Sequence, residues 1–213
     1  MKYLLCILIG YLIGTVNPSY IIAKICGFDI REKGSGNAGA SNALILFGKV
    51  LGIGCAVFDI VKATFAIWLC GTLFPELAFT FSVTGISCVV GHVFPFYMKF
   101  RGGKGLACLG GMILAFDWRV FLIMLAAEIV VAVATDYICF VPITASLAFP
   151  IVYGLLRRDL WGALILCLLI PLILYKHKEN LKRIRQKKEM PFSYLWNKEK
   201  ALAKTNIRKE DHL

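Results

Sequence analysis

Seven apolar stretches, nearly free of charged residues, limit what this chain can fold into. They cover residues 3–23, 50–73, 78–98, 105–116, 118–135, 138–156 and 159–175. Most of them approach the roughly 20 residues that a helix needs to cross the hydrocarbon core of a bilayer. Hydrophobic residues make up 59% of the chain, which is more apolar surface than one soluble core of this length buries. We therefore expect an all-α, polytopic integral membrane protein with a single bundle of about seven transmembrane helices.

The fourth stretch, residues 105–116, is shorter than the others. It is either a half-helix that starts below the headgroups or the first part of a helix that continues into the fifth stretch. The first stretch has no small-residue cleavage signature near its end, so we expect it to remain as an anchor. Short connections predict one membrane domain over residues 1–190, followed by a basic tail over residues 191–213.

Positive charge is concentrated in a few parts of the chain. The formal net charge is +11, and residues 176–213 alone contain 12 Lys and Arg against 5 acidic residues. Basic residues also occur in the connections 24–49 and 98–105. Because Lys and Arg near span ends are retained on the cytoplasmic side, we expect these loops and the C-terminus to be cytoplasmic. A basic tail on a polytopic chain suits anionic headgroups, so we expect no nucleic-acid partner.

The first polar segment is GSGNAGASN, residues 34–42, where Gly34, Gly36 and Gly39 match the spacing of a dinucleotide-binding loop. That motif requires a preceding strand within a βαβ unit, whereas the apolar stretch here is far too long for a strand. Glycines can instead let successive N–H groups point inward and form an anion-binding nest. Short polar side chains would add donors: Ser35, Asn37, Ser41 and Asn42. A flexible glycine-rich connection is the alternative.

The second polar segment is GHVFPFYMKFRGGKGLA, residues 91–107. Lys104 stands among Gly102, Gly103 and Gly105 where a helix would begin, so its ammonium and the free helical N–H groups could share a phosphate. A Walker A loop is excluded because Gly105 stands where Ser or Thr would hold magnesium. His92 is either a core histidine bonded to backbone or a catalytic or binding residue.

The third polar segment is KHKENLKRIRQKKEM, residues 176–190. On a helix, His177, Asn180 and Arg183 share one face, so an imidazole, an amide and a guanidinium can meet one ligand. A basic, lipid-anchoring helix is the alternative, although it leaves Asn180 unexplained.

Charged residues also occur inside the apolar stretches. Asp59 and Lys62 lie three apart and form either a structural ion pair or a functional pair. Glu128 is a further carboxylate with no evident partner. The eight cysteines occur singly and mostly within apolar segments, so we interpret them as small core residues and expect neither a metal site nor a disulfide.

Together these residues resemble the bacterial acyl-phosphate glycerol-3-phosphate acyltransferases, the PlsY family. The matching motifs are GSGN-x-GA-[ST]-N, D-x-x-K, GH-x-FP…KF-x-GGKG and H-x-x-N-x-x-R-x-x-x-x-x-E, spread over residues 8–189. The resemblance implies a membrane bundle in the bacterial plasma membrane with its motifs toward the cytoplasm. It also implies transfer of a fatty acyl group from acyl phosphate to the 1-hydroxyl of glycerol 3-phosphate, giving lysophosphatidic acid and phosphate, in phospholipid biosynthesis.

The same resemblance implies roles for individual residues. Catalytic roles fall on Ser35, His92 and Lys104. Substrate-binding roles fall on residues of the three polar segments: Gly34, Gly36, Asn37, Gly39, Asn42, Gly102, Gly103, Gly105, His177, Asn180, Arg183 and Glu189. The expected partners are the two substrates and membrane lipids, with no cofactor and no assigned protein partner. Acyl phosphate is already activated, so charge stabilisation and orientation can carry most of the reaction without a covalent acyl-enzyme.

The chain departs from the family pattern at several positions. Ile45 stands in place of an arginine, and Lys187 in place of a glycine. TDYICFVP, residues 135–142, replaces a serine-rich stretch and contains the departures Cys139, Val141 and Pro142. Two other functions therefore stay open. One is a transporter of anionic solutes, disfavoured because no internal repeat is evident, and the other is an inactive relative that binds lipid phosphate.

Overall fold

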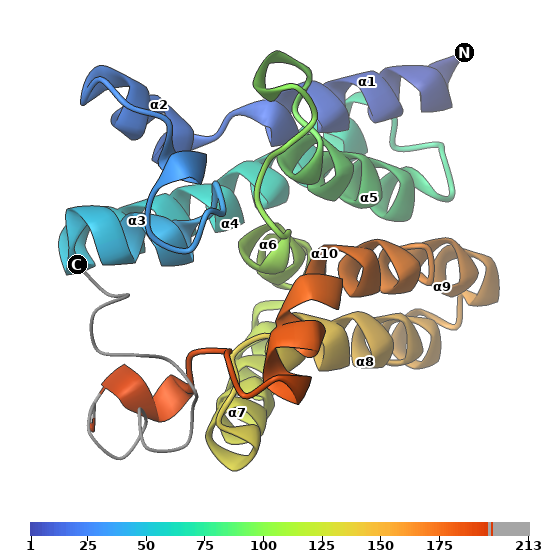
Figure 1. Cartoon of the computed structure of the whole chain (residues 1–213). Coiled ribbons are helices and arrows are strands. Elements are labelled where there is room, and N and C mark those ends of the chain that lie inside the picture. The colour runs from blue at the N-terminus through green and yellow to red at the C-terminus, as the bar shows by residue number, and fades with distance from the viewer. Residues whose placement is uncertain (196, 198–213) are drawn as a thin grey trace.

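The computed structural model describes residues 1–195 and 197, and this part of the chain contains helices and no strand. The helices, shown in Figure 1, are α1 (Lys2–Thr15), α2 (Pro18–Ile25), α3 (Ala40–Phe47), α4 (Lys49–Leu73), α5 (Thr80–Val93), α6 (Leu106–Phe116), α7 (Trp118–Thr135), α8 (Phe140–Arg157), α9 (Leu160–Leu166) and α10 (Leu169–Arg185). Short 3-10 helices lie at Ile30–Glu32, Phe96–Met98 and Phe192–Leu195.

The expected all-helical, multi-pass architecture is confirmed. In the described residues, 6 helical segments are long and apolar enough to cross a membrane, with α1 and α2 counted as one segment and α9 and α10 as another. The short stretch at 105–116 is a separate helix, α6, of 11 residues. At a rise of 1.5 Å per residue it is about 17 Å long, roughly half of the hydrocarbon thickness. Asp117 ends it and caps α7 by accepting hydrogen bonds from the backbone N–H groups of Arg119 and Val120.

The first span is not the continuous helix expected over residues 3–23. It breaks at Asn17, whose side-chain oxygen caps α2 by accepting from the Tyr20 N–H, and Pro18 follows at the first helical position. The Asn17 amide also donates to the carbonyl of Ala38 at 2.8 Å. One buried asparagine therefore ends a membrane helix and ties the break to the first polar segment.

Helix α6 lies between a group formed by α1, α4 and α5 and a group formed by α7 to α10 (Figure 1). It packs against α4 most extensively and also contacts α5, α7 and α8. Small residues allow such close packing. A Cβ on Gly111 would collide with the carbonyl of Ile60 on α4, and one on Gly14 would collide with the carbonyl of Cys88 on α5.

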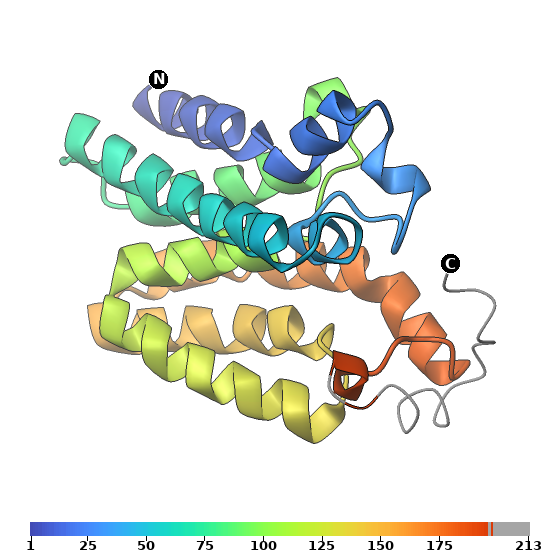
Figure 2. The ribbon, with the colours of Figure 1, turned by 90° about the vertical axis from the view of Figure 1, so that its left-hand side faces the viewer.

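The three polar segments gather at one end of this bundle. The loop between α2 and α3, the connection between α5 and α6, and the last turns of α10 lie at the end opposite the N-terminus (Figure 2). The fold thus brings together three separate segments, of which the first and the third are well over a hundred residues apart in the sequence.

Candidate functional site

Asn42 at the start of α3 organises the first polar segment. Its side-chain oxygen accepts from the backbone N–H of Ser35 at 2.8 Å. Its amide group donates to the carbonyls of Ile30 and Lys33 at 2.8 and 3.0 Å. The side chain is fully buried, so the loop itself uses the hydrogen-bonding capacity that the sequence suggested for a ligand.

Two glycines of this loop have positive φ values, and the Gly36 N–H is used within the loop, where it donates to the Lys33 carbonyl at 3.2 Å. Gly34 and Gly36 have φ values of +61° and +71°, in the left-handed region that favours glycine. Ser35 between them is exposed, while Gly39 is buried beside the second segment. A Cβ on Gly39 would lie 4.0 Å from the Cα of Gly103. The two glycine-rich segments therefore meet directly.

An ion pair that sequence reasoning missed lies just before the first polar segment and connects it to the second. The Arg31 guanidinium donates to both carboxylate oxygens of Asp29, at 2.9 and 2.6 Å, and to the carbonyl of Met98 at 2.6 Å. The hydrogen bond from Arg31 is the main reason why the pKa of Asp29 is lowered to about 2. The carboxylate thus stays ionised at physiological pH, and the arginine holds the first loop against the second.

The second segment folds back on the end of α5. The N–H groups of Gly102 and Gly103 donate to the carbonyls of Val93 and His92 at 3.0 and 3.1 Å. Gly105, at φ +90°, is the N-cap residue of α6, so Lys104 lies directly before the N-terminus of a helix, as expected.

Lys104 extends to the third segment, where its ammonium donates to the Asn180 side-chain oxygen at 2.5 Å. Burial, reinforced by the charge of Arg183, lowers the pKa of Lys104 below its ordinary value. An anionic ligand would offset this loss of solvation, because an opposite charge favours the protonated amine.

Glu189 connects the polar residues of α10. Its carboxylate accepts from the Asn180 amide and from Arg183 Nε, both at 2.5 Å. The Cys139 thiol is buried within electrostatic reach of Glu189 and Lys104, and burial raises its pKa to about 11. The departure at Cys139 therefore lies beside the predicted site and is a neutral thiol at physiological pH.

His177 is buried on the same helix, with Nδ1 2.9 Å from the carbonyl of Ile173. A carbonyl oxygen only accepts, so the proton of neutral His177 is on Nδ1 and its Nε2 is an acceptor. His177, Asn180 and Arg183 all lie on α10, at the three-residue spacing that was expected to place them on one face of the helix.

Lys187, the departure just after α10, has φ +57°. Its backbone N–H donates to the Ile184 carbonyl and that of Lys188 to the Arg183 carbonyl, as at the C-terminal end of many helices. Glycine would adopt this left-handed conformation without strain, whereas lysine adopts it less readily. The helix nevertheless ends at this position with a lysine there. Ile45, which stands in place of the family's arginine, is 61% exposed on α3.

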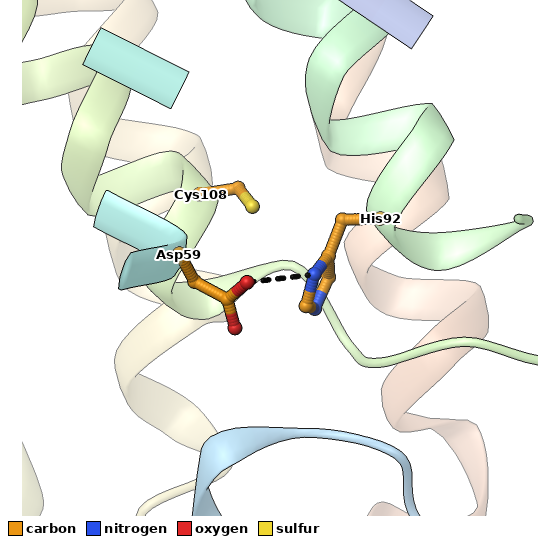
Figure 3. Close-up of side chains that lie close together, drawn as sticks. All are labelled: Asp59, His92 and Cys108. Carbon is orange, nitrogen blue, oxygen red and sulfur yellow. Dashed lines mark ion pairs between the residues drawn. The ribbon is translucent and has the colours of Figure 1, made fainter. Parts of the chain in front are cut away.

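Asp59, Lys62 and His92 form a buried cluster behind the second segment. Lys62 Nζ lies 2.6 Å from Asp59 Oδ1 and 3.1 Å from His92 Nδ1, which confirms that Asp59 and Lys62 form an ion pair. Figure 3 shows Asp59 and Cys108 beside the His92 ring, a grouping with donors that a metal ion could use. The positively charged ammonium of Lys62 already occupies the position between this carboxylate and this ring, and its charge would repel a divalent metal ion.

Glu128, which had no evident partner, has one in the fold. The Thr144 hydroxyl on α8 lies 2.6 Å from its carboxyl oxygen, where it links α7 to α8. This contact belongs to the packing of α7 against α8 and lies outside the three polar segments.

The chain is thus a multi-pass helical membrane protein with a glycine-lined, cationic site of the kind that binds phosphate groups. It belongs to the glycerol-3-phosphate acyltransferase family, whose model matches residues 4–187. Similar proteins include glycerol-3-phosphate acyltransferase 1 of Oceanobacillus iheyensis, which is 37% identical over 209 residues, with 93% of this chain and 99% of the relative covered. The glycerol-3-phosphate acyltransferase of Bacillus subtilis is 33% identical over 202 residues, with 92% and 100% covered.

Solved structures show the same similarity. The crystal structure of PlsY (YgiH), an integral membrane glycerol 3-phosphate acyltransferase, in its glycerol 3-phosphate form has a TM-score of 0.83 and 27% identity, covering 92% of this chain and 98% of that chain. Its lysophosphatidic acid form has a TM-score of 0.81, with 92% and 97% covered. The expected family, membrane fold and acyltransferase class are therefore confirmed, while the roles of individual residues stay predictions.

Proposed function

We propose that this acyltransferase moves a fatty acyl group from acyl phosphate to the 1-hydroxyl of glycerol 3-phosphate, giving lysophosphatidic acid and phosphate. The observation that carries this proposal is the meeting of the two glycine-rich loops with the polar face of α10 at one end of the bundle (Figure 2). Both substrates and both products carry phosphate, and the site offers backbone N–H groups, an ammonium and a guanidinium.

The reaction needs little covalent chemistry from the protein. The glycerol hydroxyl oxygen bonds to the acyl carbon, the bond from that carbon to the phosphate oxygen breaks, and the released phosphate takes up the hydroxyl proton. The protein must hold two phosphate-bearing molecules together and stabilise the charge that develops on the acyl oxygen. Ser35, Lys104 and His92 are the groups that we assign to this task.

Five of the remaining predicted residues form two groups by their contacts. The exposed Gly34 and Gly36 and the half-buried Asn37 line the first loop and suit direct contact with phosphate. Asn42 and Glu189 are occupied by the protein, and a carboxylate repels phosphate, so we assign them to holding the loop and orienting Asn180 and Arg183.

A lipid donor and a cytoplasmic acceptor must meet at the membrane surface. We assign the end of the bundle that contains the polar segments to the cytoplasmic face of the bacterial plasma membrane, because Lys and Arg concentrate there. Residues 1–190 would then form the catalytic membrane domain. The tail from 191 onward would follow on the same side, with 196 and 198–213 outside the described residues.

The proposal can be tested with purified protein in detergent, palmitoyl phosphate and glycerol 3-phosphate, by following phosphate release and lysophosphatidic acid. We expect release that depends on both substrates. A transporter of anionic solutes would move them across vesicles without cleaving acyl phosphate. An inactive relative would bind acyl phosphate and release no phosphate, and either of these results would refute the proposed reaction.

The orientation gives a separate prediction. Cys26 and Cys167 are the native cysteines that are not buried, so replacing both with serine leaves a background of low reactivity. In that background we expect an impermeant thiol reagent to label Lys2→Cys in intact cells and to label Ser35→Cys only after permeabilisation. Labelling of position 35 in intact cells would show that the site faces the outside.

A further inference from the structure

Lys62 of α4 lies outside the three polar segments, yet its ammonium connects three parts of the molecule. Nζ lies 2.6 Å from the carbonyl of Val16 in the break of the first span, 2.6 Å from Asp59 Oδ1 and 3.1 Å from His92 Nδ1. Hydrogen bonds join the ammonium to the Val16 carbonyl and to Nδ1 of His92, and an ion pair joins it to Asp59. The side chain is only 4% exposed, so water does not compete for these contacts.

The contact with Nδ1 determines where the proton of His92 lies. An ammonium only donates, so the ring nitrogen that it faces must accept with its lone pair. A proton on Nδ1 would point at the ammonium across 3.1 Å, while Asp59 Oδ1 is farther from Nδ1, at 3.5 Å. Neutral His92 therefore carries its proton on Nε2.

The charges around the ring favour the same state. Asp59 and Lys62 compensate each other, so a neutral imidazole leaves the buried cluster without net charge. The buried thiol of Cys108 also lies beside the ring. A second cation here would be buried without a partner of its own, which is costly in a site shielded from water.

Nε2 lies at the junction of the two glycine-rich loops. A Cβ on Gly103 would collide with Nε2, and Gly39 of the first loop lies next to Gly103. The contact with Lys62 is made through Nδ1, so Nε2 is on the side of the ring that faces Gly103. The proton on Nε2 is thus directed at the part of the site where the two loops meet.

We propose that Lys62 is a positioning residue that fixes His92 as the Nε2–H tautomer, so that the ring presents a hydrogen-bond donor to a phosphate oxygen. His177 has the opposite tautomer, with its proton on Nδ1 and Nε2 as an acceptor. One buried histidine therefore donates and the other accepts. The identity of the bound oxygen rests on the proposed function, whereas the tautomer does not.

The tautomers can be measured directly by nitrogen-15 NMR of histidine-labelled protein in lipid. The chain has 3 histidines, so His212→Gln leaves two, and His177→Gln then assigns the signals. We expect a protonated Nε2 and an unprotonated Nδ1 for His92, and the reverse for His177. A proton on Nδ1 of His92, alone or together with one on Nε2, would overturn the proposal even if the enzyme is active.

A pair of variants tests the role of Lys62. Lys62→Met alone leaves Asp59 buried and unpaired, so Asp59→Leu combined with Lys62→Met is the variant that keeps the fold. In it we expect signals of both His92 tautomers and a kcat about tenfold lower, with the KM for glycerol 3-phosphate changed less than about twofold. Glu128→Gln, which removes another membrane-embedded charge, is expected to match the wild type in both measurements.

An unchanged kcat or an unchanged single tautomer in the double variant would show that Lys62 does not position His92. A wild-type protein without acyl transfer would refute the proposed function. The tautomer assignment would still be decided by the spectrum.

Discussion

Lys104→Met is expected to lower kcat by at least about 100-fold while the protein stays folded. The ammonium projects from the start of α6 toward Asn180, between the glycine-rich loops and the polar face of α10. Removing one preorganised donor from a transition state typically costs roughly 3 kcal/mol. Methionine keeps most of the length of the lysine stem, so the packing of this half-buried side chain changes little. Phosphate release at saturating substrates and thermal unfolding in detergent measure the two effects separately.

Lys99→Met is the matched control, because Lys99 belongs to the same connection but is exposed. We expect this variant to keep its activity. Lys104→Arg should recover only part of the lost rate, since a guanidinium keeps the charge but differs in shape from an ammonium. Near-normal turnover of Lys104→Met would show that the lysine has only a structural place before the start of α6.

The membrane helices could be predicted from the sequence because the lipid bilayer allows few other backbone structures. Long apolar stretches in a bilayer must form helices, since each backbone polar group has to find its partner within the segment. The same argument says nothing about where a span is interrupted. The break at Asn17 depends on Ala38, a residue of a distant loop that accepts from the asparagine amide.

The residues within each segment of the site could be predicted from local sequence patterns. The contacts between the segments could not. Glycine spacing and the helical period indicated which residues of each segment could share a ligand. The ties between segments are tertiary: Arg31 reaches Met98, and Lys62 reaches His92 across 30 positions. Many pairs of residues could make such contacts by residue type. The packing of α4 against α5 is what brings Lys62 to His92. Asn42 illustrates the consequence, because a residue suited to a ligand is used to close its own loop.

The contact between Gly103 and His92 gives the second large expected effect. In Gly103→Ala, the new Cβ would collide with Nε2 and the neighbouring ring carbon. The ring cannot simply withdraw, because Lys62 faces Nδ1 on its other side. The backbone of the second segment must therefore move, and Lys104 moves with it. Since a displacement of about 1 Å at a site can cost 100-fold in rate, we expect kcat/KM to fall at least that far.

Gly110→Ala in α6 is the control that separates this collision from the general effect of adding a methyl group. A Cβ there would meet the side chains of Phe121 and Ile60 at 3.7 and 3.9 Å, which is ordinary contact. Alanine also favours a helix over glycine by up to about 1 kcal/mol, so Gly110→Ala should keep its activity and unfold at the same or a higher temperature. Full activity in Gly103→Ala would mean that the second segment and the His92 ring are apart in the working enzyme. In that case a donor on Nε2 could not reach the junction of the loops, and the catalytic role assigned to His92 would have to be withdrawn.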